Sequence, residues 1–163
     1  FFVEQQLAPS RQGNLIESGG TFSDEFNEHW NTVELVTDSI SVVSGEVLVA
    51  VRRQSVDPWR AQLSHSIMVQ EGQTYTICYE AKAEGPRVMT AYVDSNLDDY
   101  RNLSGGQFTA NLSASSQSYS HTFEATGTDL RARIAFNFAQ SALDVTIDNI
   151  GIYEGPTCGS PER

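Results

Sequence analysis

Short runs in which apolar and polar residues alternate recur along this chain, and they constrain its fold more than any other feature. Each run is rich in Val, Ile, Thr, Tyr and Phe, and clusters of Gly, Ser, Asn and Asp separate the runs. We predict strands at six of them: 46–52, 74–82, 87–94, 118–124, 133–138 and 145–150. Since a period of two places alternate side chains on opposite faces of a sheet, the pattern predicts an all-β fold, a sandwich or jelly roll of antiparallel sheets.

The length of the chain limits it to one domain. Its 163 residues are enough for one packed core and too few for two. Residues 1–13 lack periodicity and predict a leader or linker, and the Pro- and Gly-containing residues 155–163 predict a matching linker or tail. The ordered domain is therefore expected at 14–154. Residues 23–30 have weak helical character but are too few to predict a helix.

Acidic residues outnumber basic residues by 21 to 10, which gives a formal net charge of −11. This balance repels phosphate backbones and anionic lipid, so we expect no nucleic-acid partner and no membrane partner. The longest apolar stretch, 47–51, is far shorter than the roughly 20 residues of a membrane span. We also expect no signal peptide in this chain, because no basic segment precedes an apolar run. The net charge and the short apolar stretches together predict a soluble, acidic domain.

The two cysteines, Cys78 and Cys158, do not form a disulfide framework or a zinc motif. Cys78 falls in a predicted strand and Cys158 in the polar tail. A single bridge that fastens the tail to the sheet and a pair of free thiols are both compatible with this spacing.

Motifs for catalysis are absent from the sequence. It contains no Gly-x-Ser-x-Gly elbow, no His-Glu-x-x-His and no phosphate-binding loop with its lysine. His29, His65 and His121 are scattered singly, which is more typical of surface or packed residues than of catalytic bases. Pairs of carboxylates carry little information in a chain this acidic. No reaction is assigned.

Aromatic and amide residues in turn-rich surroundings are the more informative feature. Trp59 follows a proline, which favours a loop or a strand edge, and Tyr100 lies in a polar segment. In the run 133–138, Asn137 lies on the face opposite the apolar side chains. Aromatic plates for C–H faces and amides for hydroxyl groups are what a sugar ligand needs. The alternative, that Trp59 packs and Asn137 caps a turn, stays open at this point.

Several segments in a fixed order resemble one known family. They are NLIESGGTF at 14–22 followed by Trp30, GEVLVAV at 45–51, PWRAQL at 58–63, GQTYT at 72–76 with YEAKA at 79–83, IAFNF at 134–138 and VTIDNI at 145–150. Together they resemble the carbohydrate-binding modules of family 4/9, which are related to family 22 and accompany bacterial cellulases, xylanases and laminarinases. The matches cover nearly the whole predicted domain.

The resemblance implies a β-jelly roll of two antiparallel sheets with a glycan-binding groove on the concave sheet. It also implies a structural calcium ion that joins the N-terminal segment to the last strand. The residues at matching positions are Thr21, Gly45 and Asp148, with Glu17 and Glu46 as additional ligands. Oxygen-only ligation of this kind suits calcium. The alternative for Asp148 is a turn-capping carboxylate.

For the groove, the resemblance implies stacking by two aromatic residues and hydrogen bonds from amides. The positions are Trp59, Gln62, His65, Asn96, Tyr100, Asn137 and Gln140, with Arg60 as a further candidate. Trp59 and Gln62 are three residues apart, so both line a groove only if Trp59 lies on the preceding loop or a bulge intervenes. Trp30 is interpreted mainly as a packing residue, with ligand contact as the alternative. Phe22, Tyr75, Phe123 and Phe136 are expected in the core.

The predicted function is non-catalytic binding of a neutral plant or algal polysaccharide, a β-1,3- or β-1,4-glucan or a xylan. The module would direct an attached glycoside hydrolase to that polysaccharide, in a secreted bacterial protein, and we expect a monomer. Acidic polysaccharides are less expected because of the net charge. Two alternatives remain: a small β-jelly-roll polysaccharide lyase or glycoside hydrolase, and a structural or adhesion module without glycan binding.

Overall fold

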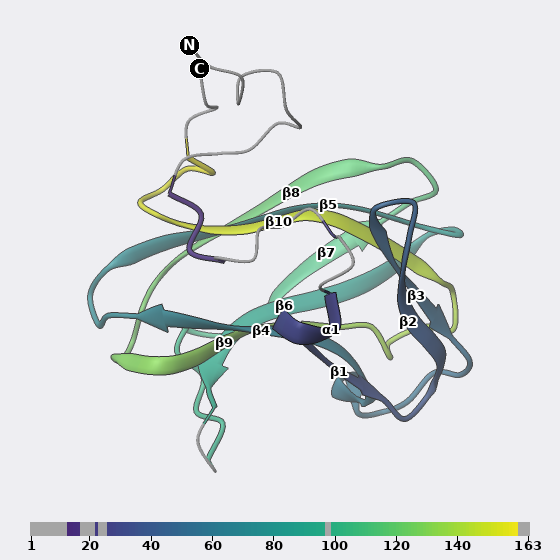
Figure 1. Cartoon of the computed structure of the whole chain (residues 1–163), viewed down its shortest axis with the longest axis horizontal. Helices are drawn as coiled ribbons and strands as arrows, with labels where there is room; N and C mark the ends of the chain where they lie inside the picture. Colours follow the sequence, from purple (N-terminus) through teal and green to yellow (C-terminus); the bar gives the residue numbers. More distant parts are fainter. Residues whose placement is uncertain (1–12, 17–21, 23–25, 97–98, 160–163) are drawn as a thin grey trace.

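The computed structural model describes residues 13–16, 22, 26–96 and 99–159. Two antiparallel sheets of five strands each pack face to face (Figure 1). The sheet that we call the front sheet has the order β1 (Trp30–Glu34), β4 (Ala61–Val69), β9 (Asp129–Asn137), β6 (Arg87–Ser95), β7 (Phe108–Leu112). The sheet that we call the back sheet has the order β2 (Thr37–Val43), β3 (Glu46–Val51), β10 (Val145–Glu154), β5 (Thr74–Ala83), β8 (Gln117–Glu124). The predicted antiparallel jelly-roll sandwich is confirmed.

Helical structure is limited, among the described residues, to two short segments. These are α1 (Phe26–His29), one turn within the stretch of weak helical character, and η2 (Pro58–Arg60). Neither has the length or the apolar composition that a helix crossing a membrane would require.

The six predicted strands coincide with β3, β5, β6, β8, β9 and β10. The sequence did not single out β1, β2, β4 and β7. The sequence of β4 does alternate over 61–67, as Ala-Gln-Leu-Ser-His-Ser-Ile, but only Ile67 and Val69 in this strand are β-branched, so its composition did not mark it as a strand. Its first five residues, 61–65, are all buried, the polar ones included.

The core lies between the sheets and takes side chains from the inner face of each. Leu63 and Phe136 come from the front sheet and Val49 and Ile147 from the back sheet, and all four are fully buried. Burial of each such side chain contributes about 1.5–3 kcal/mol relative to exposure. The residues that were expected in the core are all buried: Phe22, Tyr75, Phe123 and Phe136.

Trp30 is a packing residue, as expected. It is only 5% exposed, and its ring centroid lies 5.3 Å from that of Phe22 and 4.7 Å from that of His65. Its ring therefore belongs to the core, which leaves no surface for a ligand.

A β-bulge interrupts β10 between Asp148 and Gly151. Ile147 and Ile150 are three residues apart and are both buried in the core, which a regular strand does not allow. The bulge resolves this mismatch by adding a residue, with Asn149 at φ 50°. A Cβ at Gly151 would lie 2.7 Å from the Tyr153 ring, so the bulge also requires glycine there.

A disulfide joins Cys78 of β5 to Cys158, with their Cα atoms 5.9 Å apart. Of the two states that the sequence left open, the structure has the bridge. It fastens the segment that follows β10 to the back sheet, so the predicted tail is held to the sandwich at this position.

Candidate functional site

The outer face of the front sheet carries buried polar side chains where solvated ones would be expected. Gln62 and Asn137 are both only 3% exposed, and the register pairs them directly across β4 and β9. Asn137 also pairs with Thr90 of β6, so one row of polar side chains crosses three strands. Buried polar groups need partners, and a concentration of them on an outer face indicates a binding surface.

A groove of about 580 Å³ lies over this face. It draws on β1, β4, β9 and β6 and on the loops around Trp59 and Tyr100, so it runs across the strands. The residues that line it are Val33, Trp59, Gln62, Tyr92, Asp94, Tyr100, Asn102, Gln107 and Arg133. The lining contains one acidic and one basic side chain, so it is neutral in sum.

Trp59 enters the groove from η2, the short helical turn before β4. Backbone hydrogen bonds hold this turn: Arg60 N–H donates to the Asp57 carbonyl at 3.1 Å, and Ala139 N–H donates to the Pro58 carbonyl at 3.2 Å. The Trp59 ring is 45% exposed. Because Trp59 precedes β4, it shares the groove with Gln62 despite their spacing of three, as the loop interpretation required.

Tyr100 is the second exposed ring of the groove, 55% exposed and at a φ of 45°. The loop that carries it is fastened back to β6, because Ser95 N–H donates to the Arg101 carbonyl and Leu103 N–H donates to the Val93 carbonyl, both at 2.8 Å. Two backbone bonds at its base hold the ring over the front sheet.

Each exposed ring has a guanidinium group against it. The Arg60 guanidinium lies 5.5 Å from the Trp59 ring, and the Arg133 guanidinium lies 5.0 Å from the Tyr100 ring. Both are cation–π contacts, which help to hold each ring in its position.

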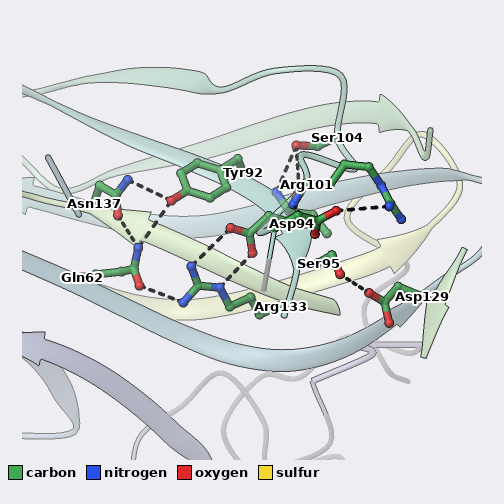
Figure 2. A network of polar contacts seen from close by, with 11 residues as sticks. Gln62, Tyr92, Asp94, Ser95, Arg101, Ser104, Asp129, Arg133 and Asn137 are labelled. Atoms are coloured by element: carbon green, nitrogen blue, oxygen red, sulfur yellow. Dashed lines mark hydrogen bonds and ion pairs between the residues drawn. The ribbon is translucent and has the colours of Figure 1, made fainter. Parts of the chain in front are cut away.

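The floor of the groove is a continuous chain of polar contacts (Figure 2). Arg133 donates to Asp94 from Nε at 2.8 Å and from a terminal nitrogen at 3.2 Å, and to Gln62 Oε1 at 2.9 Å. Gln62 Nε2 donates to Asn137 Oδ1 at 2.9 Å and to the Tyr92 hydroxyl at 3.4 Å. Asn137 Nδ2 donates to the same hydroxyl at 3.2 Å.

Burial governs the ionisation of this chain. It raises the pKa of Tyr92, so the phenol stays protonated. Burial also raises the pKa of Asp94, against the opposing effect of Arg133. Burial alone would lower the pKa of Arg133, but the Asp94 carboxylate outweighs it and the pKa is raised. The contact of 2.8 Å between Arg133 Nε and Asp94 Oδ1 makes these two residues an ion pair at one end of a neutral network.

The structure brings together part of the predicted groove set. Trp59, Gln62 and Tyr100 line the groove, and Asn137 lies in its floor. Gln140 donates from Nε2 to Thr90 Oγ1 at 2.9 Å at the edge of this face, outside the lining. Asn96 is exposed in the loop after β6 and does not line the groove.

His65 does not belong to the groove. It lies three residues after Gln62 in a regular part of β4, on the face that carries Leu63 and Ile67, and its ring packs against Trp30. Gln62 and His65 are three residues apart, as Trp59 and Gln62 are, and residues with this spacing in a regular strand lie on opposite faces. Here no bulge separates the two residues, so they face opposite ways.

Sequence reasoning missed several lining residues: Val33, Tyr92, Asp94, Asn102, Gln107 and Arg133. A period of two in 87–94 does separate Tyr92 and Asp94 from the core residues Ala91 and Val93, and it would have identified both. Arg133 shares the outward face of its strand with Asn137. Val33 and Gln107 carry no local pattern, since only the strand order brings them to the groove.

Of the residues implied for calcium, the three that the structure describes, Gly45, Glu46 and Asp148, lie on or next to strands of the back sheet. Ile147 pairs with Val47, so Asp148 and Glu46 are neighbours across β10 and β3, and Gly45 precedes Glu46 in the turn. Glu17 and Thr21 lie outside the described residues.

Asp148 Oδ1 is buried without a hydrogen-bond partner. Burial, together with Glu46 and Glu80, raises the pKa of Asp148, against the opposing bond from the Asn149 backbone. Within the described ranges, no three His, Cys, Asp or Glu side chains gather at one place suited to a metal ion.

A β-sandwich with a neutral polar groove on the outer face of one sheet, flanked by two exposed aromatic rings, has the architecture of a carbohydrate-binding module. The sequence bears this out. The model of the CBM_4_9 family, described as a carbohydrate binding domain, matches residues 13–142, and the chain belongs to this family of non-catalytic binding modules.

Solved structures share the fold at low sequence identity. The second N-terminal cellulose-binding domain of Cellulomonas fimi β-1,4-glucanase C has a TM-score of 0.73 at 18% identity, covering 92% of this chain and 100% of that one. The N-terminal cellulose-binding domain of the same enzyme has a TM-score of 0.62 at 22% identity, covering 80% of this chain and 91% of that one.

A further structure with this fold contains family 22 and GH10 modules of Clostridium thermocellum xylanase 10B in complex with xylohexaose. Its TM-score is 0.59 at 13% identity, covering 89% of this chain and 29% of that one. No curated protein matches the sequence.

Proposed function

We propose that the front-sheet groove binds an internal stretch of a neutral polysaccharide, a β-glucan or a xylan, without catalysis. The observation that carries this proposal is the combination of exposed Trp59 and Tyr100 rings with a neutral floor of amides and a phenol. A groove open across the strands suits a single chain, whereas a flat crystalline surface calls for several coplanar rings. Similar structures include a cellulose-binding domain and a complex with xylohexaose, which supports the same class of ligand.

The neutrality of the groove supports an uncharged ligand. The whole chain carries a formal charge of −11, yet the one acid and the one base of the lining, Asp94 and Arg133, neutralise each other. An acidic polysaccharide would meet a repulsive field with no unpaired cation in the lining. We therefore expect laminarin, xylan, mixed-linkage glucan or cellulose to bind and alginate not to bind.

The first test is affinity gel electrophoresis on soluble glucan and xylan with Trp59→Ala and Tyr100→Ala. Each substitution removes one stacking contact, which we expect to cost about 1 kcal/mol, or roughly fivefold in Kd. Val43→Ala is the matched control, since Val43 is an exposed apolar residue (49%) of the back sheet. Unchanged retardation of both aromatic variants would contradict the assignment of the groove.

We also propose that the module travels with a glycoside hydrolase in a secreted protein and works as a monomer. The Cys78–Cys158 bridge supports an oxidising compartment, where disulfides persist. The xylanase structure, which joins a family 22 module to a GH10 module, supports the link to a catalytic domain.

We further propose a structural calcium ion at Asp148, with Glu46, the Gly45 carbonyl, Thr21 and Glu17 as the other ligands. The unpartnered Oδ1 of Asp148 and the neighbouring Glu46 fit a hard cation, which prefers oxygen ligands. When bound, calcium would offset the repulsion between these carboxylates and stabilise the sandwich.

Calcium should raise the melting temperature, and chelation should reverse the rise. At a concentration about 100 times Kd, binding adds about 2.7 kcal/mol. Asp148→Asn should abolish this response. In chelator at neutral pH the same variant should match or exceed the wild type in stability, because the raised pKa of Asp148 means that its buried charge destabilises the metal-free fold. Equal melting temperatures of the wild type in calcium and in chelator would refute the proposal.

A further inference from the structure

The ion pair at one end of the groove floor fixes the direction of the neighbouring hydrogen bonds. A guanidinium group only donates and a carboxylate only accepts. Arg133 uses two N–H groups on Asp94 and a third on Gln62 Oε1. If the Gln62 amide were reversed, its NH₂ group would face a guanidinium N–H, donor against donor. Arg133 therefore forces Gln62 to present its oxygen.

This direction passes along the floor. With Oε1 held by Arg133, the NH₂ group of Gln62 faces Asn137 and donates to its Oδ1 at 2.9 Å. Asn137 must then turn its own NH₂ group toward Tyr92, to which it donates at 3.2 Å. Each amide has one orientation because the preceding group permits only one (Figure 2).

The chain ends on the Tyr92 hydroxyl. Its oxygen accepts hydrogen bonds from both Gln62 and Asn137. A phenol oxygen that accepts from two amides does not need its own proton inside the network, and Tyr92 lines the groove. Arg133 likewise has five N–H groups, of which Asp94 and Gln62 take three.

We propose that Arg133 sets the hydrogen-bonding direction of the groove floor, so that Tyr92 donates its hydroxyl proton to an acceptor oxygen of the bound glycan. This inference rests on the proposed glycan-binding function. Ring and glycosidic oxygens accept but do not donate, and every internal residue of a β-glucan or xylan presents them. A donor-rich floor thus recognises the backbone of the polysaccharide, and Arg133 is a positioning residue.

Gln62→Glu tests the inference because it reverses the direction and keeps the ion pair. The introduced carboxylate still accepts from Arg133, but its second oxygen accepts from the floor where an amide used to donate. The Tyr92 hydroxyl then donates its hydrogen bond either to this oxygen or to a reoriented Asn137, so its proton points into the protein and away from the groove. Gln70→Glu, an exposed residue between β4 and β5, is the control for the added charge.

Affinity for soluble mixed-linkage β-glucan is measured in a double-mutant cycle with Tyr92→Phe. We expect each single substitution to weaken binding about threefold to tenfold, the effect of one neutral hydrogen bond. The double variant should bind within about twofold of either single variant, because both remove the same contact. Wild-type affinity of Tyr92→Phe, or single effects that multiply in the double variant, would overturn the inference.

Exchange of the Tyr92 hydroxyl proton, followed by NMR without ligand, gives a second readout that a packing role would not move. The proton should exchange with water faster in the wild type than in Gln62→Glu, where the protein holds it. Slower exchange in the wild type, or equal rates, would overturn the inference even if no polysaccharide bound. Absence of binding by the wild type, with the expected exchange rates, would instead refute the proposed function alone.

Discussion

His121 of the back sheet is partly buried among aromatic rings, and the loss of contact with water on burial opposes its protonation. Its Nε2 is 2.8 Å from the Tyr79 hydroxyl, and its ring stacks on Phe108 with centroids 5.2 Å apart. Burial lowers the pKa of His121 below its usual value of about 6.5. The neutral imidazole is therefore the form that the folded chain favours.

This burial makes stability depend on pH. Just below pH 6.5 the unfolded chain binds a proton that the folded chain does not, so the free energy of unfolding falls as the pH falls. The slope cannot exceed about 1.4 kcal/mol per pH unit for one group. Urea denaturation between pH 7.5 and 5.5 should show this loss, and His121→Phe should reduce it. His29→Gln is the matched control at an exposed histidine. Identical slopes for the wild type and His121→Phe would contradict the prediction.

The candidate site was predicted best where side-chain type and local spacing suffice. Trp59 stands out because it follows a proline and Tyr100 because it lies in a polar segment, and large rings are unusual in the core at such places. Arg133 was placed on the correct face but not in the site, because its role depends on Asp94, 39 residues away in the sequence. Pairings over that distance arise from strand order, which alternation does not reveal.

At the level of elements, the sequence predicts strands that alternate and are rich in β-branched and aromatic residues. It identifies β3, with its regular inward Val47, Val49 and Val51, and also β6 and β9, which contribute to the groove, but not β4. β4 also alternates over 61–67, but the Ser-His-Ser at its centre, 64–66, is not typical of a strand. Composition, and not a loss of alternation, therefore hid this strand.

The disulfide between β5 and the segment after β10 should stabilise the sandwich. It closes a loop of 80 residues in sequence, and removal of a bridge typically costs about 2–4 kcal/mol, mainly through the freedom regained by the unfolded chain. Cys158→Ser should lower the free energy of unfolding by this amount, which urea denaturation would show as a lower midpoint. The reduced wild type is the matched comparison and should coincide with the variant. Equal midpoints of the oxidised wild type and the variant would contradict the prediction.

At the scale of the whole molecule, charge and binding surface are separated. The acidic surplus of the chain is absent from the groove lining, where Asp94 and Arg133 cancel. The composition predicts that polyanionic partners are unfavourable, but the neutrality of the groove follows only from the fold. Asp94 and Arg133 are distant in the sequence, and only the pairing of β6 with β9 brings their opposite charges together.

The two sheets also divide the work of the molecule. The disulfide and Asp148 belong to the back sheet, whereas every strand residue that lines the groove belongs to the front sheet. Substitutions on the outer face of the front sheet therefore do not alter the Cys78–Cys158 disulfide or the surroundings of Asp148. A library of variants confined to that face could be screened for binding to other sugars without altering the disulfide or Asp148. The sandwich is therefore a suitable starting point for engineered glycan-binding reagents.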